Sequence, residues 1–266
     1  MAQWMVVDES IVRLVYFVSA LIVLLILQAR APRRPLSHYR QRWSANFALV
    51  ALDALLVRLL LPLGAVGVAL WAQGNETGLL HMTPWPAWLE AGLAFLALDC
   101  LIYAQHRLFH ALPLFWRLHR VHHSDLEMDT TTGVRFHPVE ILFSMLIKMA
   151  AVVALGAPAV AVITFEIALN ATSMFSHSNL HLPAALDRML RRVLVTPDMH
   201  RVHHSIHQAE HDTNFGFNFS WWDHLFGSYT AQPADGHDNM TIGLGRFREP
   251  QAQGLGALLL QPLKPV

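Results

Sequence analysis

The stretch SIVRLVYFVSALIVLLILQ, residues 10–28, carries a single charged side chain, that of Arg13. At a rise of about 1.5 Å per residue, a helix of this length approaches the roughly 30 Å hydrocarbon thickness of a bilayer. Arg13 lies near one end, where its long side chain can reach the interface. Because Asp8 and Glu9 precede the apolar run in place of a basic segment, we expect a retained membrane anchor and not a signal peptide.

Three further apolar stretches predict additional membrane-embedded helices. Residues 47–72 and 86–105 are each long enough for one crossing. Residues 141–175 are too long for one crossing, and Gly156-Ala157-Pro158 interrupts them, so we expect a hairpin of two shorter helices there. The predicted fold is therefore all-α, an integral membrane protein with four to five membrane-embedded helical segments.

The composition agrees with a membrane protein. Hydrophobic residues make up 54% of the chain and charged residues only 14%, against about a quarter in ordinary soluble domains. The 19 basic residues balance the 19 acidic ones, so no basic field is available to recruit nucleic acid. Cys100 is the single cysteine, which excludes an internal disulfide or a thiolate metal cluster. Histidine is unusually abundant, with 17 residues.

Basic residues predict the orientation of the spans. Residues 73–84 contain no Lys or Arg, whereas five arginines crowd the loop after the first span, which is typical of a cytoplasmic loop. With alternating crossings, every histidine motif then falls on the cytoplasmic face, in a histidine-rich helical cap. The five arginines after the first span are Arg30, Arg33, Arg34, Arg40 and Arg42. From this arrangement we expect a protein of the bacterial inner membrane.

Four short histidine clusters stand out, with the spacings H-x-x-x-H, H-x-x-H-H, H-x-x-x-H and H-x-x-H-H. On a helix, positions i, i+3 and i+4 share one face, so each cluster can aim its imidazoles in a common direction. Imidazole nitrogen suits iron, zinc, copper and nickel. The ten candidate metal ligands are His106, His110, His119, His122, His123, His177, His181, His200, His203 and His204.

The repetition is what makes the clusters informative. Random placement of 17 histidines predicts roughly 0.07 H-x-x-H-H triplets, and the chain has two. A single structural zinc needs only four ligands, so ten histidines suggest two ions with about five nitrogens each. The zinc-protease motif H-E-x-x-H is absent, which removes that class of enzyme.

The cluster pattern resembles the fatty acid hydroxylase/sterol desaturase superfamily of membrane di-iron enzymes. Two other segments add to the resemblance. Arg135-Phe-His137-Pro138-Val-Glu140 is similar to the family's R-x-H-P-x-E segment, and residues 222–229 (WDHLFGSY) to its W-D-x-x-F-G-T-Y box. The resemblance covers about residues 99–229. It departs from the family pattern at Ser228 and His224, neither of which belongs to the histidine set.

This resemblance implies a chemistry and its partners. It implies two iron ions, with zinc as a substitute, and O2-dependent hydroxylation or desaturation of a C–H bond in a lipid of the acyl, sterol-like or isoprenoid class. No haem or flavin domain is recognisable in the chain, so electrons are expected from a separate donor protein of the ferredoxin or cytochrome type. No nucleic-acid partner is expected.

Two alternatives stay open at this point. A histidine-rich membrane protein can bind or transport metals, although transport sites usually lie near the bilayer midplane on broken helices. A lipid hydrolase with a dizinc site would use similar ligands. Metal content, together with reductant-dependent O2 consumption, would discriminate among the three.

Several other residues are candidates for supporting roles. His137 is either an additional ligand or a residue at the start of a helix before Pro138. Metal-bound histidines usually donate their second N–H to a carboxylate or carbonyl, which makes Asp198 and Asp223 candidate partners, although Asp198 also suits a helix cap. Asn170 is expected either near the metals or between helices.

Charged residues inside a span are candidates for function by default. Asp53 and Arg58 are five residues apart and do not share a helical face, so ion pairs between helices or snorkelling are expected for them.

The predicted organisation has N-terminal anchor helices (1–85), a catalytic domain (86–235) and a C-terminal tail (236–266), whose apolar residues 255–260 are expected on the membrane surface. Because free imidazole protonates near pH 6.5, metal affinity is expected to weaken below that pH.

Overall fold

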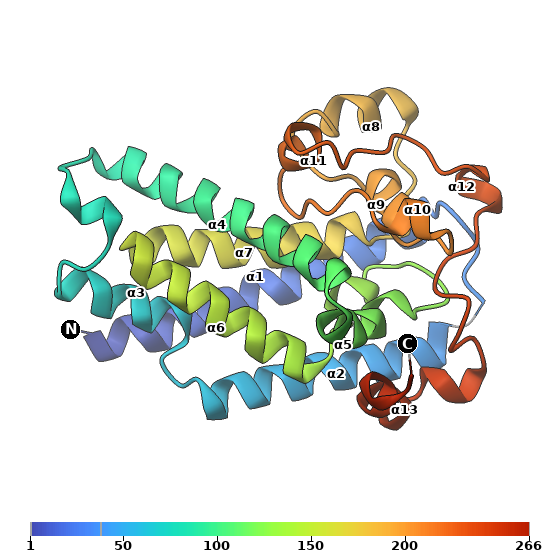
Figure 1. Cartoon of the computed structure of the whole chain (residues 1–266), viewed down its shortest axis with the longest axis horizontal. Helices are drawn as coiled ribbons and strands as arrows, with labels where there is room; N and C mark the ends of the chain where they lie inside the picture. The colour runs from blue at the N-terminus through green and yellow to red at the C-terminus, as the bar shows by residue number, and fades with distance from the viewer. Residues whose placement is uncertain (1, 38, 266) are drawn as a thin grey trace.

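The computed structural model describes residues 2–37 and 39–265, and helices make up 68% of it. Isolated bridges are the only β-type pairing in these two ranges, so the all-α prediction is confirmed. An elongated bundle forms one end of the molecule and a compact cap of short helices forms the other (Figure 1). The bundle helices are α1 (Ala2–Arg30), α2 (Tyr39–Leu60), α3 (Gly64–Gly74), α4 (Ala87–Ala111), α6 (Pro138–Leu155) and α7 (Ala159–Ser176).

The cap contains the shorter elements. Its α-helices are joined by long loops and flanked by 3₁₀ turns, of which η2 (Thr132–Val134) packs against the bundle. The cap also contains η3 (Pro250–Gln253) and η4 (Gln261–Leu263), whereas η1 (Leu79–Met82) connects α3 and α4 at the other end of the bundle, where it contacts α6. The α-helices are α5 (Pro113–His123), α8 (Ala184–Leu190), α9 (Pro197–His203), α10 (Gln208–His211), α11 (Trp221–Leu225), α12 (Gly236–Asn239) and α13 (Leu255–Leu260).

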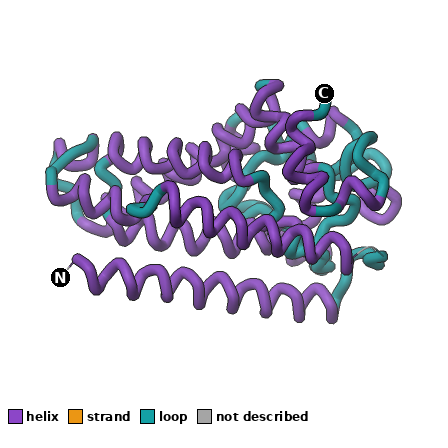
Figure 2. Tube along the Cα trace, turned by 90° about the horizontal axis from the view of Figure 1, so that it is seen from below, coloured by secondary structure: helices purple, strands orange, loops and turns teal. Residues whose placement is uncertain are grey.

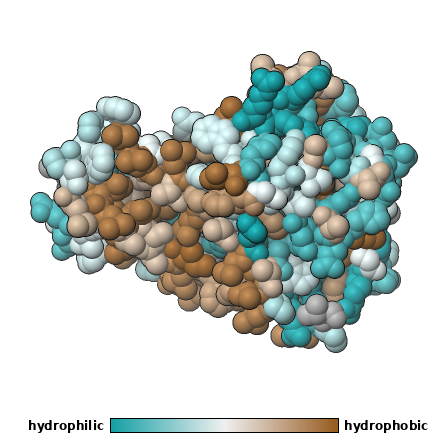
Figure 3. Space-filling model, turned by 45° about the horizontal axis from the view of Figure 1, so that its top comes forward, coloured by the Kyte–Doolittle hydropathy of each residue, from teal (hydrophilic) through white to brown (hydrophobic). Residues whose placement is uncertain are grey.

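The bundle has the surface of a membrane protein. Within the described residues, five helical segments are long and apolar enough to cross a bilayer. Large apolar side chains of α1 stand exposed, among them Leu14 at 61% and Val15 at 56%, and α1 runs along one edge of the bundle (Figure 2). Hydrophobic side chains form a belt across the bundle, while hydrophilic ones gather over the cap (Figure 3). An exposed apolar surface of this kind is typical of a protein embedded in lipid.

The second predicted span is not one continuous helix. The segment 47–72 divides into the end of α2 at Leu60 and the start of α3 at Gly64. Pro62 lies in the break, where it lacks the N–H that a continuous helix requires. The whole segment still qualifies as a span by length and hydropathy, so the predicted crossing holds, with a break in the helix at Pro62.

The predicted hairpin at 141–175 is confirmed as α6 and α7. Gly156 ends α6 with a left-handed backbone (φ 68°), and its N–H bonds to the carbonyl oxygens of Val152 and Val153. A Cβ at Gly156 would lie 2.6 Å from the carbonyl oxygen of Thr77, so a larger residue does not fit at this turn. Pro158 then precedes the first turn of α7.

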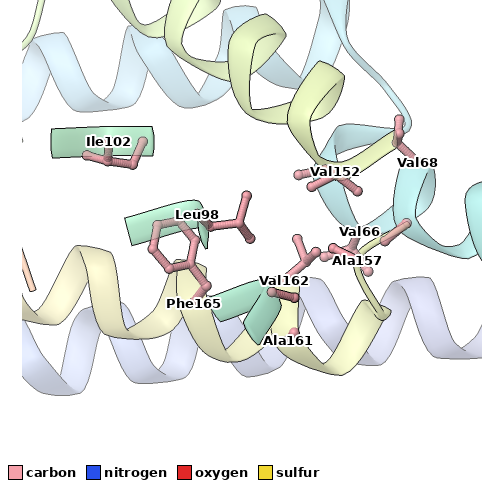
Figure 4. Close-up of a cluster of buried hydrophobic side chains, with 12 residues drawn as sticks. Val66, Val68, Leu98, Ile102, Val152, Ala157, Ala161, Val162 and Phe165 are labelled. Carbon is pink, nitrogen blue, oxygen red and sulfur yellow. The ribbon is translucent and has the colours of Figure 1, made fainter. Parts of the chain in front are cut away.

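The core of the bundle lies where α3, α4, α6 and α7 meet (Figure 4). Leu98 of α4, Val152 of α6 and Phe165 of α7 are fully buried there. Interdigitated aliphatic and aromatic side chains hold these four helices together through dispersion contacts. Phe95 stacks edge-on against Phe165 with ring centroids 5.4 Å apart.

The chain crosses the bundle so that the histidine motifs meet at one end. In Figure 1 the C-terminal ends of α1, α4 and α7 lie at the cap, as do the N-terminal ends of α2 and α6. The N-terminus lies at the opposite end. The prediction that all histidine motifs share one face of the membrane is therefore consistent with the chain path, and the assignment of that face to the cytoplasm stays a prediction.

The C-terminal segment packs against protein. Leu258 of α13 is fully buried against Ala45 and Leu49 of α2 and Val121 of α5. Residues 255–260 pack one face on the cap, whereas Leu260 is 59% exposed, and their expected location on the membrane surface stays a prediction. The domain boundaries at 85 and 235 stay a prediction.

Ion pairs inside the bundle differ from those expected. Lys148 of α6 donates to Glu166 of α7 at 2.6 Å, and Arg13 of α1 also contacts Glu166. Arg58 is exposed. Within residues 9–37 and 41–265 Asp53 forms no ion pair, so the expected pairing of that carboxylate with another helix is wrong.

Candidate metal centre

Nine of the ten candidate histidines meet in two adjacent groups. The ligand nitrogens within each group lie within 4.8 Å of one another. The five-histidine group contains His106, His110, His119, His123 and His203. The four-histidine group contains His122, His177, His200 and His204. All nine side chains are buried; His110 is partly exposed only as a whole residue, and its side chain is 3% exposed. Each group could hold one metal ion.

The helical spacing explains how the motifs divide between the groups. On α5, His119 and His123 are four residues apart and join the five-histidine group, while His122 joins the other. At α9 the division is reversed, because His200 and His204 join the four-histidine group and His203 the five-histidine group. Each H-x-x-H-H motif therefore contributes to both groups, which is why the two groups are adjacent.

The Nδ1 atoms of most of these histidines face protein acceptors. A neutral imidazole that donates its Nδ1–H leaves a lone pair on Nε2, which is the form that binds a metal. Five of the acceptors are backbone or buried carboxylate oxygens at 2.6–3.2 Å: Phe215 for His106, Glu140 for His119, Arg135 for His122, Ser173 for His177 and Thr213 for His203. Asp212 accepts from Nδ1 of His110 at 3.0 Å.

The Nε2 atoms converge on one another. Nε2 of His177 lies 3.0 Å from Nε2 of both His122 and His200, and Nε2 of His110 lies 3.1 Å from that of His123. Two imidazole nitrogens bound at right angles to one ion at about 2.1 Å would be about 3.0 Å apart. The remaining Nε2 atoms are buried without a hydrogen-bond partner among the described residues, namely those of His106, His119, His203 and His204. This donor set fits two metal ions.

Burial keeps the imidazoles neutral. It lowers the pKa of His119 and of His177 to about 3. Burial, followed by the neighbouring histidines, also holds the pKa values of His203 and His204 well below the usual range. At neutral pH these rings are therefore ready to act as ligands without first losing a proton.

One predicted ligand lies apart from both groups. His181 is exposed, and its backbone N–H donates to the carbonyl oxygen of Ala31 at 2.7 Å. His211, which the sequence analysis did not select, lies closer to the centre. Its ring stacks on Trp116 at 5.4 Å and is 6.0 Å from the ring of His110. Because His211 lies outside the spacing of the last cluster, the sequence pattern did not predict that its side chain lies close to His110.

None of the four candidate supporting residues forms a hydrogen bond or ion pair with a member of the two histidine groups among the described residues. Nδ1 of His137 accepts the backbone N–H of Val139 and thereby caps α6, which is the helix-start role. Asp198 pairs with Arg33 and Arg201. Asn170 donates to the carbonyl oxygen of Glu166 within α7. These three residues therefore make contacts within the protein scaffold, and the bond of Asn170 stays within its own helix.

Asp223 acts on the centre through a loop. Its carboxylate accepts the backbone N–H groups of Phe215 and Gly216 at 2.8 and 2.9 Å and the hydroxyl of Ser228. The carbonyl oxygen of Phe215 in turn accepts from His106. Burial raises the pKa of Asp223 to about 6, against the hydrogen bonds that lower it. Asp223 therefore holds the loop that orients a ligand.

Sequence reasoning missed the carboxylates that contact the histidines directly. Glu140 flanks the clusters in sequence, but Asp198 and Asp223 were preferred to it as partners, and Asp212 was not selected. No spacing rule links Glu140 to His119, because they lie on different helices that meet through tertiary packing.

A cavity of about 370 Å³ leads from the centre into the bundle. His106 and His119 of the five-histidine group line it, together with apolar side chains of α2, α4 and α6 such as Val50, Ile102 and Met145. A cavity of this size is large enough for part of a lipid chain.

Taken together, the membrane bundle and its capped histidine centre define a membrane-embedded metal-binding protein. The family model described as fatty acid hydroxylase matches residues 91–228, just over half of the chain. The chain belongs to the fatty acid hydroxylase family, within the superfamily that its motifs resemble. No solved structure matches it.

Several curated proteins are similar to the chain. The ornithine lipid hydroxylase OlsE of Rhizobium tropici is 29% identical over 199 residues, which cover 74% of this chain and 58% of that protein. The alkylglycerol monooxygenase of Danio rerio is 30% identical over 62% of this chain and 36% of its own length. A methylsterol monooxygenase (2-2) of Arabidopsis thaliana is 24% identical over 57% of this chain and 58% of its own. The matches therefore span between about a third and three-fifths of these relatives' lengths.

Proposed function

We propose that this protein is a membrane-bound, O2-dependent lipid monooxygenase that hydroxylates a C–H bond of a lipid chain. The observation that carries the proposal is the juxtaposition of two buried histidine groups with a cavity inside a membrane bundle. A soluble substrate would need no such bundle, whereas an acyl, sterol-like or isoprenoid chain can enter the cavity from the bilayer. The named relatives, which are lipid hydroxylases or monooxygenases, support the same class.

The two histidine groups would hold two iron ions, one in each group. When bound, such ions supply the redox chemistry for O2 activation, which protein side chains alone cannot provide. Zinc would accept the same imidazoles, but it has no redox chemistry and would give an inactive protein. His181, exposed in this structure, is a ligand only if its segment moves.

The chain's own residues orient and shield the reaction. Glu140 and the carbonyl oxygen of Phe215 fix the ring planes of His119 and His106, which line the cavity. The apolar walls exclude water and hold the lipid chain against the centre. Hydroxylation converts C–H, O2, two electrons and two protons to C–OH and water. A separate ferredoxin- or cytochrome-type protein would supply the electrons.

Desaturation is the second candidate outcome, because it begins by removal of the same hydrogen. The position of the chain in the cavity would decide between the two products. We further propose that the cap faces the cytoplasm of a bacterial inner membrane, since the arginine-rich loop after α1 belongs to the cap end.

The test is to reconstitute the purified protein with iron, a reductase system and total membrane lipid, and to supply isotopically labelled O2. We expect labelled oxygen in a lipid product and reductant-dependent O2 consumption. Lipid cleavage without O2 consumption would indicate the dizinc hydrolase instead. Metal transport into vesicles without lipid oxidation would indicate the transporter. Either result would overturn the proposal.

A further inference from the structure

The cavity has a polar stripe along one helix. Glu140, Ser144 and Lys148 of α6 are spaced by four residues and all line the cavity. Residues four apart lie on one face, about 6 Å further along the axis at each step. Starting from the partner of His119, the stripe therefore runs about 12 Å away from the histidine centre. A purely apolar chain would form no hydrogen bonds with these polar side chains.

The far end of the stripe is satisfied by its own ion pairs. Lys148 donates to Glu166 at 2.6 Å, and Arg13 contacts both Glu166 and Glu9. Two cations and two carboxylates balance one another there. This charged cluster is a structural feature of the bundle and offers no unmatched charge to a ligand.

Two other residues that line the cavity differ from this charged cluster, because each has a buried acceptor atom without a hydrogen-bond donor in the part of the chain that the structure describes. Asp53 of α2 is only 6% exposed, and its Oδ1 has no hydrogen-bond partner among the described residues. Gln105 of α4 is 9% exposed; its amide nitrogen donates to Ser144, and its Oε1 is unpartnered in the same described ranges. Both residues line the cavity. Oε2 of Glu140, at the histidine end of the stripe, is likewise unpartnered among the described residues. Leaving a buried acceptor unmatched costs about 1–3 kcal/mol, so the acceptors of Asp53 and Gln105 together indicate a ligand that donates.

We propose that Asp53 and Gln105 form a polar subsite that binds a hydrogen-bond-donating group of the lipid, either O–H or N–H, including an ammonium. As a substrate subsite this inference rests on the proposed function; as a binding site it does not. Gln105 lines the same cavity as His106 and His119, so the subsite and the five-histidine group share this cavity. The subsite would select lipids with a donor group close to the oxidised carbon, and would discriminate against purely apolar chains and methyl ethers.

The subsite can be tested by binding alone. The metal-loaded full chain in nanodiscs is titrated with hexadecan-1-ol, hexadecylamine and hexadecyl methyl ether, and dissociation constants are measured by native mass spectrometry. We expect the alcohol, the amine or both to bind about tenfold more tightly than the ether, which lacks a donor hydrogen. The alcohol and amine arms distinguish a neutral donor from a cation. Equal affinity for all three probes would overturn the proposal.

Two variants separate recognition from folding. Asp53→Leu keeps the branching at Cγ and removes the unmatched acceptor, so we expect it to abolish the preference while leaving thermal stability unchanged or raised. Leu55→Ala, at a position on the same helix that is 54% exposed, is the matched control and should keep the preference. A preference that survives in Asp53→Leu would contradict the subsite. If Asp53→Leu instead lowers stability strongly, Asp53 is a structural residue and the proposal is wrong.

The outcome is independent of the proposed reaction. A protein that oxidises a lipid but binds all three probes equally would retain the monooxygenase and lose the subsite. A protein that discriminates among the probes but oxidises no lipid would retain the subsite and lose the monooxygenase.

Discussion

Glu140 of α6 accepts a hydrogen bond from Nδ1 of His119 of α5 at 2.6 Å, and both side chains are buried. The contact joins a helix of the membrane bundle to a helix of the cap. A carboxylate in this position fixes the tautomer of the ring, turns its Nε2 toward the other histidines and increases its basicity. The geometry of the centre therefore depends on residues that bind no metal.

Replacement of Glu140 tests this dependence. We expect Glu140→Ala to weaken metal affinity by about 10–100-fold, because His119 would lose its orienting acceptor. Glu140→Gln keeps an acceptor oxygen and should weaken affinity less. Metal content after dialysis against a graded series of chelator concentrations measures the effect, with the exposed neighbour Val139→Ala as control. Unchanged affinity in Glu140→Ala would show that the contact does not support the ligand.

The position of His181 leads to a second prediction. Because its side chain is exposed and lies outside both groups, His181→Ala should retain the metal content of the unmodified protein. His203→Ala and His122→Ala remove one member of each group and should each lower metal content and abolish lipid oxidation. Inductively coupled plasma mass spectrometry on purified protein gives the counts. Loss of metal in His181→Ala would show instead that His181 is the tenth ligand, as the motif predicts.

The first loop of the cap depends on a cation from the bundle. Arg42 of α2 is fully buried and bonds to the carboxylates of Asp125 and Asp129, the latter at 2.8 Å. Arg42→Ala would leave these two carboxylates buried without their cation, at a cost of about 3–5 kcal/mol. Thermal unfolding in detergent should show a large fall in the melting temperature. The exposed Arg58→Ala on the same helix serves as control, and an equal fall in both variants would contradict the assignment.

Stability of the metal-free protein should fall in mild acid. Burial lowers the pKa of His119 and of His177 to about 3, whereas the unfolded chain titrates near 6.5. Below pH 6.5 these histidines are protonated in the unfolded chain but stay neutral in the folded protein. Their contribution to the free energy of unfolding is therefore fully present above pH 6.5 and is lost progressively as the pH falls toward 3. Each such histidine contributes about 1.4 kcal/mol per pH unit across this window. Melting temperatures of the metal-free protein from pH 8 to pH 4.5 should decline only below pH 6.5; no decline would contradict the buried neutral rings.

The same burial changes the expectation for the metal-loaded protein. Sequence reasoning placed the loss of affinity near pH 6.5, the value for free imidazole. Rings that stay neutral in the folded protein should keep their ions below that pH until the fold itself is lost. Metal content and melting temperature are therefore expected to fall together, which parallel measurements on one sample can check.

The sequence predicted the features that depend on local spacing. The apolar runs predicted the crossings, Gly156 and Pro158 predicted the hairpin, and the i, i+3, i+4 spacing predicted which imidazoles share a direction. The break after Leu60 coincides with Pro62, which lies inside the apolar run of the second predicted span.

The features that the sequence did not predict depend on tertiary packing. The division of each H-x-x-H-H motif between two groups requires α5 and α9 to face each other. The partners of the Nδ1 atoms are mainly backbone carbonyls, such as that of Phe215, which have no signature in the sequence. His177 and His181 are four residues apart, as are His106 and His110. Because α7 ends at Ser176, however, His181 lies outside the helix, and helical periodicity does not predict the direction of its side chain.

An anomalous difference map from crystals of the iron-loaded protein, collected at the iron absorption edge, tests the central claim most directly. The account predicts two peaks per chain, one surrounded by Nε2 atoms of His106, His119 and His203 and one by those of His122, His177 and His200. A single peak, or peaks outside the two histidine groups, would contradict it.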